Sequence, residues 1–171
     1  MRNFGVLSVA TFSLALACGG SKGVKPGGGG DETPTWVAQG TGAFNVESGK
    51  KLQGVGVAPR SDPRKRRQAA DAAAAQQLQG GIDALAAGLS KMTESTKENV
   101  GDEIAAIVRK AAAAVPHVHD HYVAEGSESA LDQVDVGALK QAVQGVDGDD
   151  NLKREIANNL DRAFDQLAPK Q

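Results

Sequence analysis

Two segments of this chain indicate how its strands and helices pack. One is KLQGVGVA at residues 51–58, and the other is the alanine-rich AADAAAAQQLQ at residues 69–79. Valines alternate with glycines in the first segment, which is typical of a β-strand. Gly54 and Gly56 weaken a strand unless another backbone packs closely over them, because glycine has no side chain to bury. A helix surfaced with alanine can approach that closely. The two segments therefore predict a strand covered by the helix that follows it.

The sequence has the pattern of two β-hairpins. In the first, apolar residues alternate at Phe44 and Val46 before a turn at residues 47–50, which leads into the strand at 51–58. In the second, residues 117–123 and 130–136 have strand character on either side of AEGS at 124–127. Short alternating segments joined by a glycine-containing turn are typical of antiparallel pairs. We therefore expect a small antiparallel sheet.

The alanine-rich helix has a well-marked start. Asp62 is a suitable N-cap and Pro63 fits the first helical position, and we expect the helix to stop at Gly80-Gly81. Its first turn holds four basic residues, RKRR at 64–67, which oppose the helix dipole. These residues are either a solvated helix end or a surface for anionic lipid or glycan.

Residues 82–92 are ambiguous between helix and strand. Ile82, Leu85, Leu89 and Met92 recur at helical spacing, whereas the flanking and internal glycines interrupt a helix. The polar residues 90–99 are expected to form a loop.

Three further helices are expected in the second half of the chain. An amphipathic stripe over residues 100–115 ends at Pro116, a short helix covers residues 139–143, and Asp149-Asp150 caps a helix with its apolar face at 152–167. The mixture of strands and helices predicts an α+β fold, with helices laid on one face of an antiparallel sheet.

The amino terminus has the features of an export signal. A positive charge at Arg2 precedes a short apolar run, and LALAC at 14–18 resembles a lipobox that ends at Cys18, the only cysteine in the chain. We therefore predict a lipoprotein signal peptide at 1–17, lipidated Cys18 in a flexible glycine-rich tether at 18–34, and one folded domain at 35–171. The alternative is a soluble secreted protein in which Cys18 is incidental, but an unpaired thiol is a liability in an oxidising compartment.

Several motifs of the predicted domain are similar to those of the Lpp-twenty lipoprotein family, small outer-membrane lipoproteins of Gram-negative bacteria. The motifs are Trp36, Gly40-x-Gly42-Ala43-Phe44, Gly54-Val55-Gly56, Arg67-x-x-Ala70-x-x-x-Ala74-x-x-x-Leu78, and Asp120-His121-Tyr122 followed by Ser129-Ala130-Leu131-Asp132. Gln53, Tyr122 and Ser129 stand where the family has other residues, mostly aromatic. The resemblance spans residues 36–143 and implies an outer-membrane location, a strand at 82–90 and no common enzymatic activity.

Composition narrows the range of partners. Removing residues 1–17 takes away one basic and no acidic residue, so the formal net charge falls from −2 to −3. A domain that binds nucleic acid would carry a basic stripe, so we expect no nucleic-acid partner. Aromatic residues are 4% of the chain and much of its apolar content is alanine, which buries little area. Such a thin core makes self-association, or binding to other envelope proteins or glycan, a reasonable expectation.

The candidate ligands for a metal ion are His117, His119 and His121, which are all the histidines of the chain. Alternate residues of a strand share one face, so three imidazoles could point the same way, with Asp120 on the opposite face. Imidazole binds Zn, Cu and Ni, but residues two apart lie about 6.6–7 Å apart along a strand, which is wide for one tetrahedral ion. The metal site is therefore the alternative interpretation, and no cofactor is assigned.

No motif predicts catalysis. The histidines are not accompanied by a recognisable nucleophile motif, and the glycine pairs lack the strand-loop-helix context of phosphate-binding loops. The favoured hypothesis is a non-enzymatic lipoprotein, anchored through Cys18 on the periplasmic face of the outer membrane, with a domain that binds other envelope components. The alternative is a periplasmic metal-binding protein that uses the three histidines.

Overall fold

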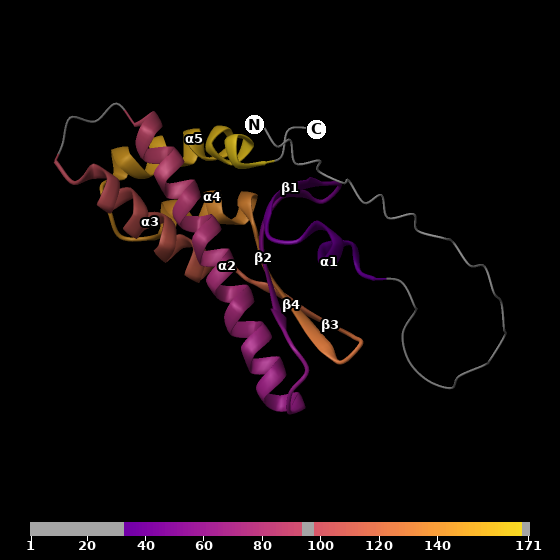
Figure 1. Cartoon of the computed structure of the whole chain (residues 1–171). Helices are drawn as coiled ribbons and strands as arrows, with labels where there is room; N and C mark the ends of the chain where they lie inside the picture. The colour runs from indigo at the N-terminus through magenta and orange to yellow at the C-terminus, as the bar shows by residue number, and fades with distance from the viewer. Residues whose placement is uncertain (1–32, 94–97, 169–171) are drawn as a thin grey trace, which may run out of the picture. The chain divides into compact units, whose positions relative to one another are not determined.

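The structure, a computed structural model, describes residues 33–93 and 98–168. Among these residues, four antiparallel strands form one sheet in the order β1-β2-β4-β3, and five helices accompany it (Figure 1). In chain order the elements are α1 (Thr35–Gln39), β1 (Gly42–Val46), β2 (Gly49–Ala58), α2 (Pro63–Met92), α3 (Val100–Ala114), β3 (Val118–Ala124), β4 (Ser127–Asp135), α4 (Val136–Gly145) and α5 (Asp150–Leu167). The predicted α+β class and both hairpins are confirmed.

The second hairpin has a two-residue turn that fixes its register. Glu125 and Gly126 both have positive φ, 50° and 84°, as a primed hairpin turn requires. The register then pairs Ala124 with Ser127 and, further along, His119 with Asp132. The hairpin places its polar residues at fixed positions across two strands.

Helix α2 packs directly on the glycines of β2. A side chain at Gly54 would overlap the backbone of Ala74 and Leu78, and one at Gly56 would overlap the backbone of Ala70 and Ala74. The alanines at these points are fully buried. The predicted close approach between a glycine strand and an alanine-rich helix is therefore confirmed.

The predicted end of this helix at Gly80-Gly81 is wrong, because α2 continues without a break to Met92. Residues 82–92 are consequently helical, and the strand implied at 82–90 is not present. Two glycines inside a helix cost about 1 kcal/mol each. Burial of Ile82, Leu85 and Leu89 offsets this cost, since each large apolar side chain contributes about 1.5–3 kcal/mol.

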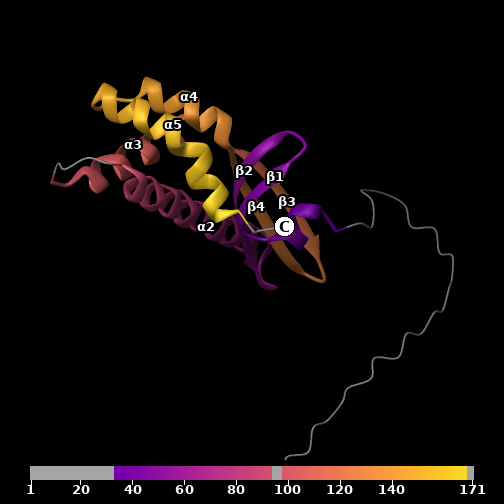
Figure 2. The ribbon, with the colours of Figure 1, turned by 90° about the horizontal axis from the view of Figure 1, so that it is seen from above.

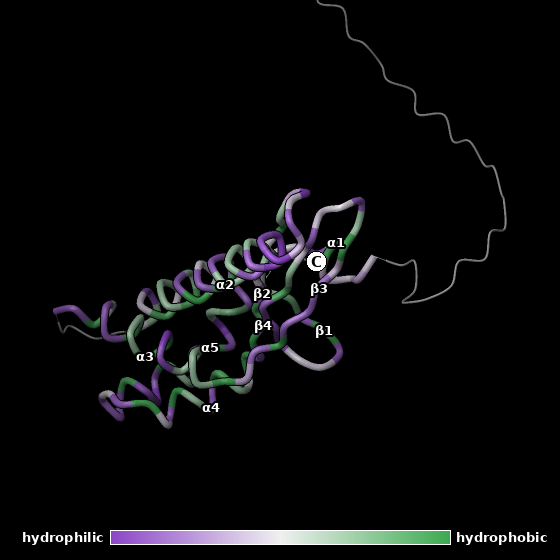
Figure 3. The backbone as a smooth tube through the Cα atoms, turned by 90° about the horizontal axis from the view of Figure 1, so that it is seen from below, coloured by the Kyte–Doolittle hydropathy of each residue, from purple (hydrophilic) through white to green (hydrophobic). Residues whose placement is uncertain are grey.

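The two halves of α2 have different neighbours. Its first half lies across β2 and β4, and its second half packs against α3 and α5, away from the sheet (Figures 1 and 2). The main core lies among these helices and reaches the sheet at Leu52 and Val134. A smaller cluster of four alanines fills the space between helix and sheet: Ala58, Ala70, Ala74 and Ala130. Hydropathy alternates along α2 accordingly (Figure 3).

Helix boundaries elsewhere follow the local sequence. The side chain of Asp62 accepts hydrogen bonds from the backbone N–H groups of Arg64 and Lys65, and Asp149 does the same for Asn151 and Leu152. The predicted caps are thus confirmed, as are the helices α3, α4 and α5.

The predicted signal peptide at 1–17, Cys18 and the tether as far as residue 32 lie outside the described residues. Within residues 33–93 and 98–168, no helix combines the length and apolar character needed to cross a membrane.

Candidate metal centre

The candidate site lies on the side of β3 and β4 that faces α2. In the ladder, Asp132 of β4 pairs with Gly54 on one side and with His119 on the other. Because Gly54 lets α2 approach closely, Asp132 is only 6% exposed. Burial of a carboxylate is unfavourable unless a cation or hydrogen-bond donor compensates its charge. The two nearest histidines supply this compensation.

His117 is held between the sheet and α3. It precedes the first residue of β3, so its side chain is not bound to the spacing of a regular strand. Its Nε2 lies 3.1 Å from the carbonyl oxygen of Ala112 in α3, and its Nδ1 lies 2.7 Å from Oδ1 of Asp132. A carbonyl oxygen can only accept, so Nε2 carries a hydrogen and donates it. Nδ1 therefore faces the carboxylate, and one metal ion could bind both atoms if they moved about 0.6 Å further apart.

His119 completes the group from the solvent side. Its Nδ1 lies 3.7 Å from the same Oδ1 of Asp132, its side chain is 61% exposed, and its ring stacks on that of His117 with the centroids 5.9 Å apart. One donor atom from each of His117, His119 and Asp132 therefore lies within 4.8 Å of the others.

These separations suit one small ion. Two donors on a tetrahedral ion with bonds of about 2.0–2.1 Å are about 3.3 Å apart. The observed 2.7 and 3.7 Å to the carboxylate lie on either side of this value, and the donor atoms of all three residues lie within 4.8 Å of one another, so one ion requires shifts of about 0.5–1.5 Å. The bond from His117 to the Ala112 carbonyl is the outer contact that orients a metal-binding imidazole in many sites. Two imidazoles and one carboxylate suit Zn²⁺, or Fe²⁺ where positions stay open.

His121 lies outside this three-donor group. Its Nε2 is 3.1 Å from Oδ1 of Asp71 in α2, and its Nδ1 is 3.1 Å from Oε1 of Glu128 in β4. The second contact has the distance of an ion pair without hydrogen-bond alignment, and the atom has no hydrogen-bond partner among the described residues. The predicted set of three histidines is therefore divided, and Asp132 takes the third place.

The basic start of α2 is more than a solvated helix end. Nε of Arg66 lies 3.2 Å from Oε2 of Glu128, and its Nη1 donates to the carbonyl of Gly126 at 2.9 Å. The side chains of Arg66 and Glu128 are only 14% and 6% exposed. This ion pair joins α2 to the second hairpin, whereas Arg64, Lys65 and Arg67 are exposed.

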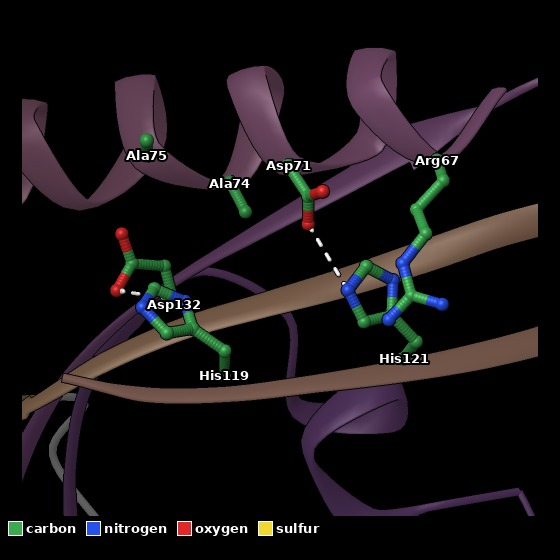
Figure 4. Close-up of a pocket in the computed structure, with 7 residues that line it drawn as sticks. All are labelled: Arg67, Asp71, Ala74, Ala75, His119, His121 and Asp132. Carbon is green, nitrogen blue, oxygen red and sulfur yellow. Dashed lines mark ion pairs between the residues drawn. The ribbon is translucent and has the colours of Figure 1, made fainter. Parts of the chain in front are cut away.

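A pocket of about 390 Å³ adjoins the three donors. It lies between α2 and the strands β3 and β4, and the helix side chains project into it toward the histidines (Figure 4). Its lining comprises Arg67, Asp71, Ala74, Ala75, His119, His121 and Asp132.

The remaining predicted positions are placed as follows. Asp120 lies on the opposite face of β3, as expected, where it accepts a hydrogen bond of 2.9 Å from Nε1 of Trp36. Cys18 is outside the described residues. The spacing of the histidines does not predict Asp132 as a donor, although the two-residue turn at Glu125-Gly126 indicates which residues pair across the hairpin. Counting outward from that turn pairs position 119 with position 132.

Comparisons of this chain with protein-family models, with curated proteins and with solved structures found no match.

Proposed function

We propose that the folded domain binds a divalent transition-metal ion through His117, His119 and Asp132. The observation that carries this proposal is the Nδ1–Oδ1 contact of 2.7 Å between His117 and buried Asp132, with the other imidazole nitrogen anchored on a carbonyl. Zn²⁺ is the ion that these donor types favour, with Fe²⁺ as the alternative. The role is one of binding or buffering, without catalysis.

We also propose that this domain is held in the cell envelope by a lipid on Cys18. Two features support this: the lipobox-like LALAC at residues 14–18, and the resemblance of residues 36–143 to the Lpp-twenty family. Anchoring on the periplasmic face of the outer membrane would expose the site to ions in the periplasm. Palmitate labelling and membrane fractionation test this part. Unlabelled protein, or a Cys18→Ser variant retained equally by membranes, would remove the anchor from the account.

Calorimetric titration tests metal binding. The protein is the full chain without an affinity tag and with Cys18→Ser, because that change removes the thiol as a competing ligand. One Zn²⁺ per chain is expected. His119→Gln should weaken binding about tenfold or more, since it removes a donor.

The matched control is His121→Gln, the same substitution two residues along the same strand. It should leave zinc affinity unchanged because His121 is outside the three-donor group. Equal losses in both variants would instead support the set of three histidines, and no heat in the parent protein would refute metal binding.

A further inference from the structure

The pocket beside the three donors is large enough for a second ligand. Two of the donors, His119 and Asp132, belong to its lining. Its volume of about 390 Å³ falls within the range of about 300–1,000 Å³ that is usual for small-molecule sites. Ala74 and Ala75 on the helix side leave this space open, since their side chains are short (Figure 4). A small molecule in the pocket could therefore reach an ion held by the donors.

Three protein donors leave coordination unfilled on such an ion. Zinc sites with three protein ligands keep the fourth position for water or another ligand. Two of the donors, His119 of β3 and Asp132 of β4, also line the pocket, which extends from these strands toward α2. The unfilled position is thus available to a molecule that enters the pocket.

The charge of the pocket depends on the ion. With neutral histidines the lining has a formal charge of −1, because Asp71 and Asp132 outnumber Arg67. A divalent ion changes this value to +1. Asp71 is further engaged by Nε2 of His121 at 3.1 Å, whereas Arg67 has no ion-pair partner among residues 33–93 and 98–168. The pocket therefore disfavours anions when empty of metal and favours them when metal is bound.

We propose that the metal-loaded pocket binds a small organic dicarboxylate. One carboxylate gives an oxygen to the open metal position, and the other pairs with the guanidinium of Arg67. Two separate positive centres, one on the strand side of the pocket and one on α2, select a ligand with two separate negative groups, and guanidinium pairs with carboxylate through two parallel hydrogen bonds. This inference rests on the metal binding proposed above.

Cobalt spectroscopy tests this inference, because the visible absorption of Co²⁺ changes with its ligands. The full chain carrying Cys18→Ser is loaded with Co²⁺ and titrated with malonate, and acetate serves as the monocarboxylate comparison. Malonate should change the spectrum in a saturable way and bind more tightly than acetate. Arg67→Ala should weaken the binding of malonate about tenfold, which corresponds to about 1.4 kcal/mol of binding free energy.

The control variant is Arg64→Ala, which removes the same charge from the same turn of α2 but outside the pocket lining. It should bind malonate as the parent does. Equal malonate affinity in the parent and Arg67→Ala, loss of the cobalt bands on titration, or equal binding without metal would overturn the inference while leaving metal binding intact. Failure of cobalt to bind at all would overturn both.

Discussion

Nδ1 of His117 and Oδ1 of Asp132 lie 2.7 Å apart, although fifteen positions separate the two residues in the sequence. The contact depends on three features of the fold. The hairpin register sets Asp132 beside His119, the approach of α2 over Gly54 buries the carboxylate, and α3 supplies the carbonyl that orients the imidazole. The site is therefore a product of the same packing that forms the domain.

Zinc should stabilise the protein through this contact. A ligand at about 100 times its Kd that binds only the folded state adds about 2.7 kcal/mol, which for a domain of this size raises Tm by roughly 8 °C. Asp132→Asn should abolish the shift while keeping the shape of the side chain. Thermal unfolding with zinc and with a chelator measures it, and an equal shift in the variant would exclude Asp132 as a ligand.

Gly54→Ala should destabilise the domain by about 3 kcal/mol or more. The added methyl overlaps the backbone of α2 at Ala74 and Leu78, so the whole helix must move. Gly80→Ala is the matched control, since nothing lies within 4 Å of the new methyl on that exposed side of α2. The control should gain up to about 1 kcal/mol from helix propensity. Urea unfolding measures the free energy of unfolding of both variants. Similar changes in the two would contradict the close packing of α2 on β2.

Glu128→Gln should destabilise the domain by about 2–4 kcal/mol. The substitution leaves the largely buried Arg66 without its counter-charge, and removal of one partner from a buried ion pair is costly. Lys65→Ala, one position earlier on the exposed side of the helix, should change the free energy of unfolding by less than about 0.5 kcal/mol. Chemical denaturation compares the two, and a negligible effect of Glu128→Gln would mean that the pair is solvated.

The free energy of unfolding should depend on pH in the acid range through Asp161 of α5, which contacts Lys140 of α4 and Lys50 of β2. Its hydrogen bond with Lys140 (2.8 Å) lowers the pKa of this carboxyl, and Lys50 in β2 lowers it further, although partial burial opposes both. A lowered folded-state pKa gives stabilisation that is present above the unfolded value near 3.8 and is lost as the pH falls through the folded value. Since Asp161 is half exposed, the effect is about 0.5 kcal/mol.

Asp161→Asn should therefore reduce the free energy of unfolding at neutral pH, and the difference from the parent should vanish at about pH 2. Glu47→Gln, in the exposed turn between β1 and β2, is a charge-matched control. A difference that persists undiminished in acid would show that the substitution acts through packing and not through charge.

Much of the fold could be predicted from local pattern. Asp62 and Asp149 indicated where two helices start. The alternation of glycine with valine at 54–57 predicted the close contact of β2 with the alanines of α2. The continuation of α2 past Gly80-Gly81 could not be predicted from the local sequence. It depends on Ile82 and Leu85 finding a core built by helices that come much later in the chain.

Only part of the candidate site could be predicted from the sequence, for a similar reason. Spacing two suggested that His117, His119 and His121 act together, but spacing alone does not show which carboxylates lie across the ladder. Asp132 and Glu128 lie on the inner face of β4 and draw the histidines into two different groups. Only the register of the hairpin separates these groups.

Anomalous diffraction from crystals of the zinc-loaded full chain, with Cys18→Ser, would show directly which side chains bind the ion. We expect one zinc peak at about 2.0–2.2 Å from a nitrogen of His117, a nitrogen of His119 and an oxygen of Asp132, with its open side toward Arg67. A peak bonded to His121 in place of Asp132, or no peak between these strands at saturating zinc, would contradict it.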